Sequence, residues 1–129
     1  MDVSQTPDLA PALAVLAAFA QGQTSFINAA RLRLKESDRI ASICAMLSAC
    51  GVKVHEEKEG FAVYGPAEVK GGTVDSYGDH RIAMAAAILG CFSTEPIVIK
   101  GAECVAKSYP DFFDDLAQLG GKCHVAVEG

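Results

Sequence analysis

Residues 73–99 read TVDSYGDHRIAMAAAILGCFSTEPIVI, and this stretch decides the expected fold. Residues 73–75 predict a short strand, and Asp79 precedes apolar residues that recur at helical spacing as far as Gly90. The β-branched run at residues 97–99 predicts a second strand. Strands that alternate with a helix in this way indicate the α/β class.

The same pattern occurs earlier in the chain, at an offset of about 71 residues. This offset aligns Asp8 with Asp79, and a strand at Ile27 with the strand at Val98. We therefore predict two copies of a β-α-β-α-β-β unit, over about residues 1–66 and 72–127, built from helices plus mixed sheets. The second copy lacks its last strand, and the opening strand of the first copy is reduced to residues 1–3.

Helix caps, apolar spacing and turn residues predict the other elements. They are a helix opened by Thr6, Pro7 and Asp8 and ending before Gly22, a strand at 24–28, a helix capped by Ser37 or Asp38 and ending at Gly51, a hairpin of strands 52–56 and 60–64, a helix opened by a capping box at Ser108–Asp111 and ending at 120–121, and a strand at 122–127.

Composition limits the classes of function. The 129 residues are half apolar and carry a formal charge of −5, which favours a packed globular domain and argues against nucleic acid or an anionic membrane surface as a partner. The longest apolar stretch, residues 9–20, contains Pro11 and is too short to span a bilayer. Five cysteines without metal-ligand spacing favour free thiols in a reducing cytoplasm, and we expect no metal site.

Charged residues gather at the predicted helix starts. Acids there are expected from capping and the helix dipole, but Arg39, Arg81 and Lys107 place cations at the positive end of a helix. A bound anion would explain them, because helix-terminal N–H groups and guanidinium groups together bind anions. The alternative is that these are ordinary surface side chains paired with neighbouring acids such as Asp38 or Asp79.

Three sequence motifs resemble the C-terminal part of the 5-enolpyruvylshikimate-3-phosphate synthase family. They lie at residues 34–39 (LKESDR), 79–84 (DHRIAM) and 107–113 (KSYPDFF). Asp8, which lies 27 residues before Lys35, resembles the acidic site residue of that family. The resemblance covers about residues 1–125. It implies the enolpyruvyl transferase fold, an inside-out α/β barrel whose active site lies in a cleft between two domains.

The resemblance also implies an activity. The family transfers the enolpyruvyl group of phosphoenolpyruvate to the 5-hydroxyl of shikimate 3-phosphate in the shikimate pathway of aromatic amino-acid biosynthesis, and releases phosphate without a metal or an organic cofactor. On this interpretation residues 1–129 are part of the C-terminal domain of a cytoplasmic transferase. The partner that completes the site is the enzyme's N-terminal domain, so we expect the isolated chain to be inactive.

The resemblance assigns roles residue by residue. Asp8 would accept the proton of the attacking hydroxyl beside Lys35, which also contacts the shikimate phosphate, and Glu36 would exchange protons with the methylene carbon of the donor. Three cations would bind the donor: Arg39 and Arg81 would hold its carboxylate, and Lys107 would neutralise its phosphate. No role is assigned to Arg31, which stands where some family members have Asn.

Two other functions fit parts of this pattern. The related UDP-N-acetylglucosamine enolpyruvyl transferase shares the fold and the donor but depends on a cysteine loop and lacks the LKESDR arrangement. A non-catalytic module that binds phosphorylated metabolites would also place cations at helix starts, but it would gain nothing from Asp8 and Glu36.

Overall fold

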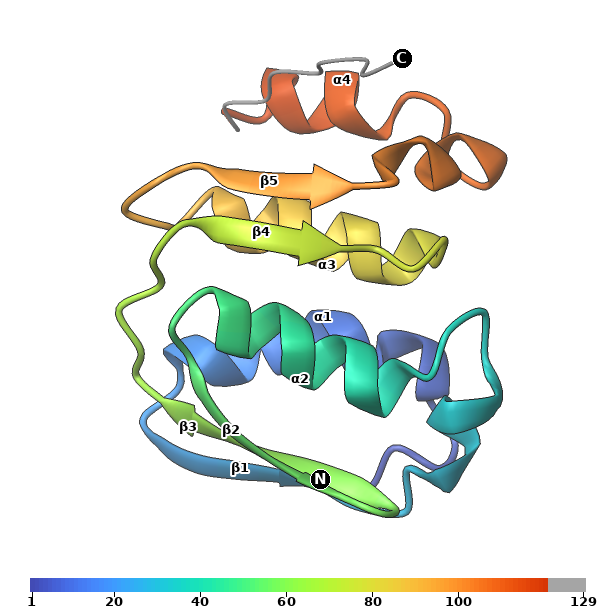
Figure 1. The fold of residues 1–129 in the computed structure, drawn as a ribbon, viewed down its shortest axis with the longest axis vertical. Helices are drawn as coiled ribbons and strands as arrows, with labels where there is room; N and C mark the ends of the chain where they lie inside the picture. Colours follow the sequence, from blue (N-terminus) through green and yellow to red (C-terminus); the bar gives the residue numbers. More distant parts are fainter. Residues whose placement is uncertain (121–129) are drawn as a thin grey trace.

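Three helices pack against one another as one helix layer in the computed structural model, which describes residues 1–120, with one small sheet below α1 and α2 and a second in front of α3 (Figure 1). Helices α1 and α2 pack on the first sheet, α2 also contacts strand β4, and α3 packs on strand β5 of the second sheet. In chain order, with η for 3-10 helices, the elements are η1 (Pro7–Leu9), α1 (Ala10–Phe19), β1 (Gly22–Phe26), η2 (Ala30–Leu34), α2 (Arg39–Ala49), β2 (Lys53–Glu57), β3 (Gly60–Gly65), β4 (Gly72–Asp75), α3 (His80–Gly90), β5 (Ile97–Lys100), η3 (Ala102–Lys107) and α4 (Phe112–Gln118).

The two sheets use both strand directions. The first is antiparallel with the order β1-β3-β2, and a parallel bridge joins Asp2 to Ile27 just beyond β1. The second consists of β4 and β5, which are parallel and pair Thr73 with Val98. Thr73 and Val98 lie 71 residues after Asp2 and Ile27, so the two parallel pairings have the same register. The predicted α/β class with mixed sheets is confirmed, and residues 1–120 contain no closed barrel.

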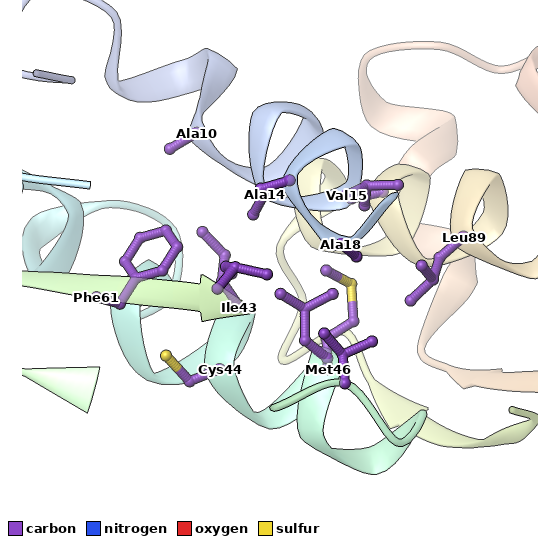
Figure 2. Packing of buried hydrophobic residues seen from close by; sticks show 14 of the residues in the cluster. Ala10, Ala14, Val15, Ala18, Ile43, Cys44, Met46, Phe61 and Leu89 are labelled. Atoms are coloured by element: carbon purple, nitrogen blue, oxygen red, sulfur yellow. The ribbon is translucent and has the colours of Figure 1, made fainter. Parts of the chain in front are cut away.

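The core lies between the helices and the first sheet. Helix α1 is apolar on every side, and its small residues Ala14 and Ala18 are fully buried beside α2. Figure 2 shows them in one cluster with Ile43 and Met46 of α2. Small side chains let two helices approach closely, so the alanine-rich sequence of α1 sets the spacing of the helix layer.

The chain also approaches itself closely where α2 meets the second sheet. A Cβ atom at Gly72 would lie 2.5 Å from the carbonyl oxygen of Ala49, near the end of α2. Only glycine fits this contact without a shift of the backbone. Gly72 thus allows the start of β4 to pack directly against the C-terminal end of α2.

Two of the predicted helix caps are confirmed and two are wrong. Asp38 and Asp79 cap α2 and α3 as predicted, with side chains that accept hydrogen bonds from Ala41 N and Arg81 N. Thr6 makes no side-chain cap, because the turn η1 intervenes before α1 begins at Ala10. The capping box predicted at Ser108 is also wrong, because α4 begins at Phe112. The strand predicted at 122–127 lies outside the described residues.

None of the helices in residues 1–120 has both the length and the apolar character needed to cross a bilayer.

Candidate functional site

The N-terminal ends of α1, α2 and α3 lie on the same side of the molecule (Figure 1). Each of the three ends carries charged residues. Asp8 lies in η1 directly before α1, Lys35 and Glu36 precede α2, Arg39 opens α2, and Arg81 lies in the first turn of α3. The helix layer therefore brings together side chains that are up to 73 positions apart in the sequence, from 8 to 81.

Arg39 is the centre of this group. Its side chain is only 1% exposed, yet the guanidinium contacts three carboxylates. Nε donates to Asp79 Oδ2 at 2.8 Å and Nη2 to Asp79 Oδ1 at 3.2 Å, while Nη1 donates to Asp8 Oδ1 at 2.8 Å and Nη2 also to Glu36 Oε2 at 2.6 Å. A buried guanidinium needs such partners because an uncompensated charge in the interior is strongly unfavourable.

Asp79 is the buried partner of Arg39 and is itself 0% exposed. Besides the two bonds from Arg39, its carboxylate accepts a hydrogen bond from Ser37 Oγ at 2.8 Å and one from Arg81 N at 3.0 Å. Burial alone would raise the pKa of Asp79, but the hydrogen bonds from Arg39 and Ser37 outweigh burial and lower it. The charged form of Asp79 thus connects the start of α2 to the start of α3.

Asp8 and Glu36 hold Arg39 from the solvent side. Their side chains are 56% and 51% exposed. The hydrogen bond from Arg39 lowers the pKa of Asp8, and the charges of Lys35 and Arg81 lower it further. Both carboxylates are therefore within reach of a molecule in solution.

Lys35 and Arg81 complete the site. Within residues 1–120 neither side chain forms an ion pair or a hydrogen bond, although both lie close enough to Asp8 to act on its pKa. The side chain of Lys35 is exposed and that of Arg81 is partly exposed. The site thus contains Arg39, whose N–H groups donate four hydrogen bonds to carboxylates, and two cations without an ion-pair partner in residues 1–120.

The structure brings five of the six predicted site residues together: Asp8, Lys35, Glu36, Arg39 and Arg81. For the sixth, Lys107, the structure describes the backbone, which ends η3, an element that packs against α3. Arg31 is exposed in η2 and takes part in none of these contacts.

The carboxylate contacts match one part of the alternative interpretation of Arg39 and differ from another part. Arg39 is paired with Asp79 of the same chain, and the alternative interpretation proposed this kind of pairing with a neighbouring acid. Arg39 is not an ordinary surface side chain, however, because it is buried.

Sequence reasoning missed two features of the site. It predicted Asp79 as a helix cap or a surface partner for a cation, and the position of Asp79 between Gly78 and His80 gave no sign of burial. It also passed over Arg33, which donates to Asp38 Oδ2 at 2.8 Å, to Glu56 Oε2 at 3.2 Å and to the carbonyl oxygens of Glu57 and Lys58. Arg33 thereby fastens the segment before α2, which carries Lys35 and Glu36, to the β2–β3 hairpin.

A hollow of about 360 Å³ lies beside this segment, lined by Ser37, Asp38, Ala41, Ser42 and Tyr77. Its hydroxyl groups and the ring of Tyr77 give it a mixed polar and apolar wall. It is open to solvent between the N-terminal end of α2 and the loop before α3.

Other reactive groups lie apart from the site. In residues 1–120 no group of three or more His, Cys, Asp or Glu side chains is arranged to hold a metal ion. Burial raises the pKa of the Cys44 thiol to about 12 and also raises that of Cys50, so neither is a nucleophile at neutral pH.

Comparison with protein families identifies a match over most of the chain. Residues 1–116 match the model of a family described as EPSP synthase (3-phosphoshikimate 1-carboxyvinyltransferase). Two similar relatives are the 3-phosphoshikimate 1-carboxyvinyltransferases of Clostridium kluyveri, 52% identical over 122 residues, and of Clostridium acetobutylicum, 49% identical over 124 residues. These matches cover 95% and 96% of this chain but 29% of each relative, so the chain spans less than a third of their length.

Solved structures show the same similarity in three dimensions. An EPSP synthase from Acinetobacter baumannii matches with a TM-score of 0.92 at 36% identity, over 97% of this chain and 30% of its own. The enolpyruvyl transferase NikO from Streptomyces tendae matches with a TM-score of 0.72 at 22% identity, over 94% of this chain and 27% of its own. The predicted enolpyruvyl transferase fold is confirmed by these matches.

Proposed function

This chain belongs to the EPSP synthase family, and we propose that it supplies one side of an active site that transfers an enolpyruvyl group from phosphoenolpyruvate to the 5-hydroxyl of shikimate 3-phosphate. The observation that carries the proposal is the convergence of Asp8 and Glu36 on Arg39, with Lys35 and Arg81 beside them. Two solvent-accessible carboxylates among cations suit a reaction that moves protons on anionic substrates.

The first half of the reaction forms a bond and moves two protons. The 5-hydroxyl oxygen adds to the carbon of phosphoenolpyruvate that bears the phosphate, and Asp8 accepts the hydroxyl proton. Glu36 donates a proton to the methylene carbon, which becomes a methyl group in the tetrahedral adduct. The hydrogen bond from Arg39 lowers the pKa of Asp8, so the carboxylate is charged at neutral pH but is a weak base while that bond is in place.

The second half reverses the proton transfer at carbon. The bond between carbon and the phosphate oxygen breaks, and the departing phosphate, neutralised by Lys107, takes up the proton that Asp8 accepted. Glu36 removes a proton from the methyl group to form the enol ether. Lys35 contacts the shikimate phosphate, and Arg39 and Arg81 hold the donor's carboxylate, since a guanidinium group matches a planar carboxylate.

We further propose that the chain is part of the C-terminal domain of a cytoplasmic enzyme, with units at about residues 1–66 and 72–127. The equal registers of the two parallel strand pairs support the division into units. The coverage of 29% of the relatives' length supports the partial domain. An N-terminal domain would then supply the other contacts to both substrates.

A chimera tests this proposal. We would replace the matching stretch of the Clostridium kluyveri relative with this chain and measure phosphate release from phosphoenolpyruvate plus shikimate 3-phosphate. We expect turnover by the chimera, none by the isolated chain because most positioning contacts are absent, and a loss of at least about a hundredfold for Glu36→Gln or Lys107→Ala in the chimera.

Glu56→Gln is the matched control, because Glu56 binds Arg33 on the hairpin side and is assigned no role in the reaction. A folded chimera without turnover would contradict the proposal. Turnover that survives Glu36→Gln and Lys107→Ala would contradict the assigned roles and would favour a non-catalytic binding module.

A further inference from the structure

The two acids assigned to proton transfer and the arginine assigned to the donor's carboxylate are bound to each other. Nη1 of Arg39 donates to Asp8 at 2.8 Å and Nη2 donates to Glu36 at 2.6 Å. In this state the acids lie where the substrate carboxylate would bind. Substrate binding would therefore require Arg39 to exchange one carboxylate partner for another. This inference rests on the proposed function, because it concerns how a substrate enters the same site.

Four of the N–H groups of Arg39 already donate hydrogen bonds to carboxylates. A guanidinium group has five N–H bonds. Nε–H and one Nη2–H point to Asp79, the other Nη2–H points to Glu36, and one Nη1–H points to Asp8. A carboxylate that binds Arg39 through both terminal nitrogens must therefore take the place of an acid that is already there.

The three acids differ in how easily they can leave. Asp79 is 0% exposed and is held by Ser37 Oγ and Arg81 N as well as by Arg39, so its departure would leave a buried charge without a partner. Asp8 and Glu36 are more than half exposed and can turn into water. Exposed ion pairs are weak, each worth at most about fivefold in an equilibrium constant.

We propose that Asp8 and Glu36 close the unliganded site by occupying Arg39, and that a substrate carboxylate opens it by displacing them while Asp79 stays in place. The exchange replaces two exposed carboxylates by one, so Arg39 keeps Asp79 and the substrate carboxylate as its partners. Lys35 and Arg81, which have no ion-pair partner within residues 1–120, remain available to the phosphate and carboxylate groups of the substrates. Binding of the donor thus frees the groups that act on it.

The proposal predicts that each closing acid competes with the ligand. Removing the charge of Glu36 or Asp8 should tighten the binding of phosphoenolpyruvate by about two- to fivefold, the value of one exposed ion pair. The matched control is again Glu56→Gln. Glu56 is 44% exposed and also binds an arginine, but that arginine is Arg33. The same loss of charge should leave its affinity within about 1.5-fold of the original.

The experiment is an NMR titration of the 129-residue chain with phosphoenolpyruvate, for the original sequence and for Glu36→Gln, Asp8→Asn and Glu56→Gln. Amide shifts give the dissociation constants, which we expect in the millimolar range. In the original sequence, the side-chain carboxyl ¹³C signals of Asp8 and Glu36 should move on binding, and that of Asp79 should stay.

Four results would overturn the exchange. The acids do not compete with the ligand if all four proteins bind it with equal affinity. They also do not compete if the carboxyl signals of Asp8 and Glu36 stay in place when the ligand binds. Neither result would contradict the proposed function. Tighter binding in all three variants, Glu56→Gln included, would assign the effect to net charge. Absence of binding in every protein would also refute the exchange, while turnover by the chimera decides the proposed function independently.

Discussion

Replacing Asp79 with asparagine should lower the free energy of unfolding by about 3 to 5 kcal/mol, the usual loss when one partner of a buried ion pair is neutralised. Both members of this pair are buried, Arg39 at 1% and Asp79 at 0% exposure. Asparagine keeps the shape of the side chain and caps helices as well as aspartate does, but it removes the charge and replaces one acceptor oxygen by an NH2 group that faces hydrogen-bond donors.

The loss can be followed by urea denaturation with far-UV circular dichroism, because the chain has no tryptophan. Domains of this size are stable by about 5 to 15 kcal/mol, so the midpoint should move substantially. Because Asp8 and Glu36 still compensate part of the charge of Arg39, we expect the lower end of the range. The comparison is Glu56→Gln, which breaks a partly exposed pair and should cost less than about 1 kcal/mol. Equal losses for the two variants would refute the argument that burial makes the Arg39–Asp79 pair essential.

Two further predictions concern pH and backbone packing. The pKa of Asp8 and of Asp79 is lowered in the folded chain, so their contribution to stability is complete above the ordinary carboxyl pKa of about 4 and is lost as the pH falls below it. The urea concentration at the unfolding midpoint should therefore decrease when the pH falls below about 4, and Asp79→Asn should make this decrease smaller. A midpoint that rises on acidification would contradict this. Gly72→Ala should lower the free energy of unfolding by about 1 to 3 kcal/mol, because the new Cβ would lie 2.5 Å from Ala49 O. In the control Gly90→Ala the new Cβ would have its nearest neighbour at 3.7 Å, so the thermal midpoint should stay the same or rise slightly. Equal midpoints for these two variants would show that the contact at Gly72 relaxes freely.

Features set by neighbouring residues could be predicted from the sequence. Asp38 and Asp79 cap their helices because an Asx side chain bonds the N–H groups two or three residues later, whatever lies elsewhere in the fold. The β2–β3 hairpin is equally local. The predictions at Thr6 and Ser108 failed because 3-10 turns precede α1 and α4, and propensities distinguish poorly between such a turn and the first turn of an α-helix.

The partners of the arginines could not be predicted in the same way. Residue type and position suggested that Arg39 faces an anion, but the choice among several nearby acids depends on which of them is buried when α2 packs beside α3. The contacts of Arg33 depend on carbonyl oxygens of a turn that lies 24 and 25 residues further along the chain. Both cases need the tertiary packing, which no local pattern contains.

The two aspartates on Arg39 are related by the internal repeat. Asp79 lies 71 residues after Asp8, the offset that also relates the two parallel strand pairs. Each half of the chain therefore presents an acid to Arg39 from the corresponding position. The two positions differ in environment, since one copy is sealed in the interior and the other faces water. Chemically identical groups thus have different surroundings: Asp79 is enclosed beside the cation, and Asp8, to which we assign the proton transfer, is the copy that a substrate can reach.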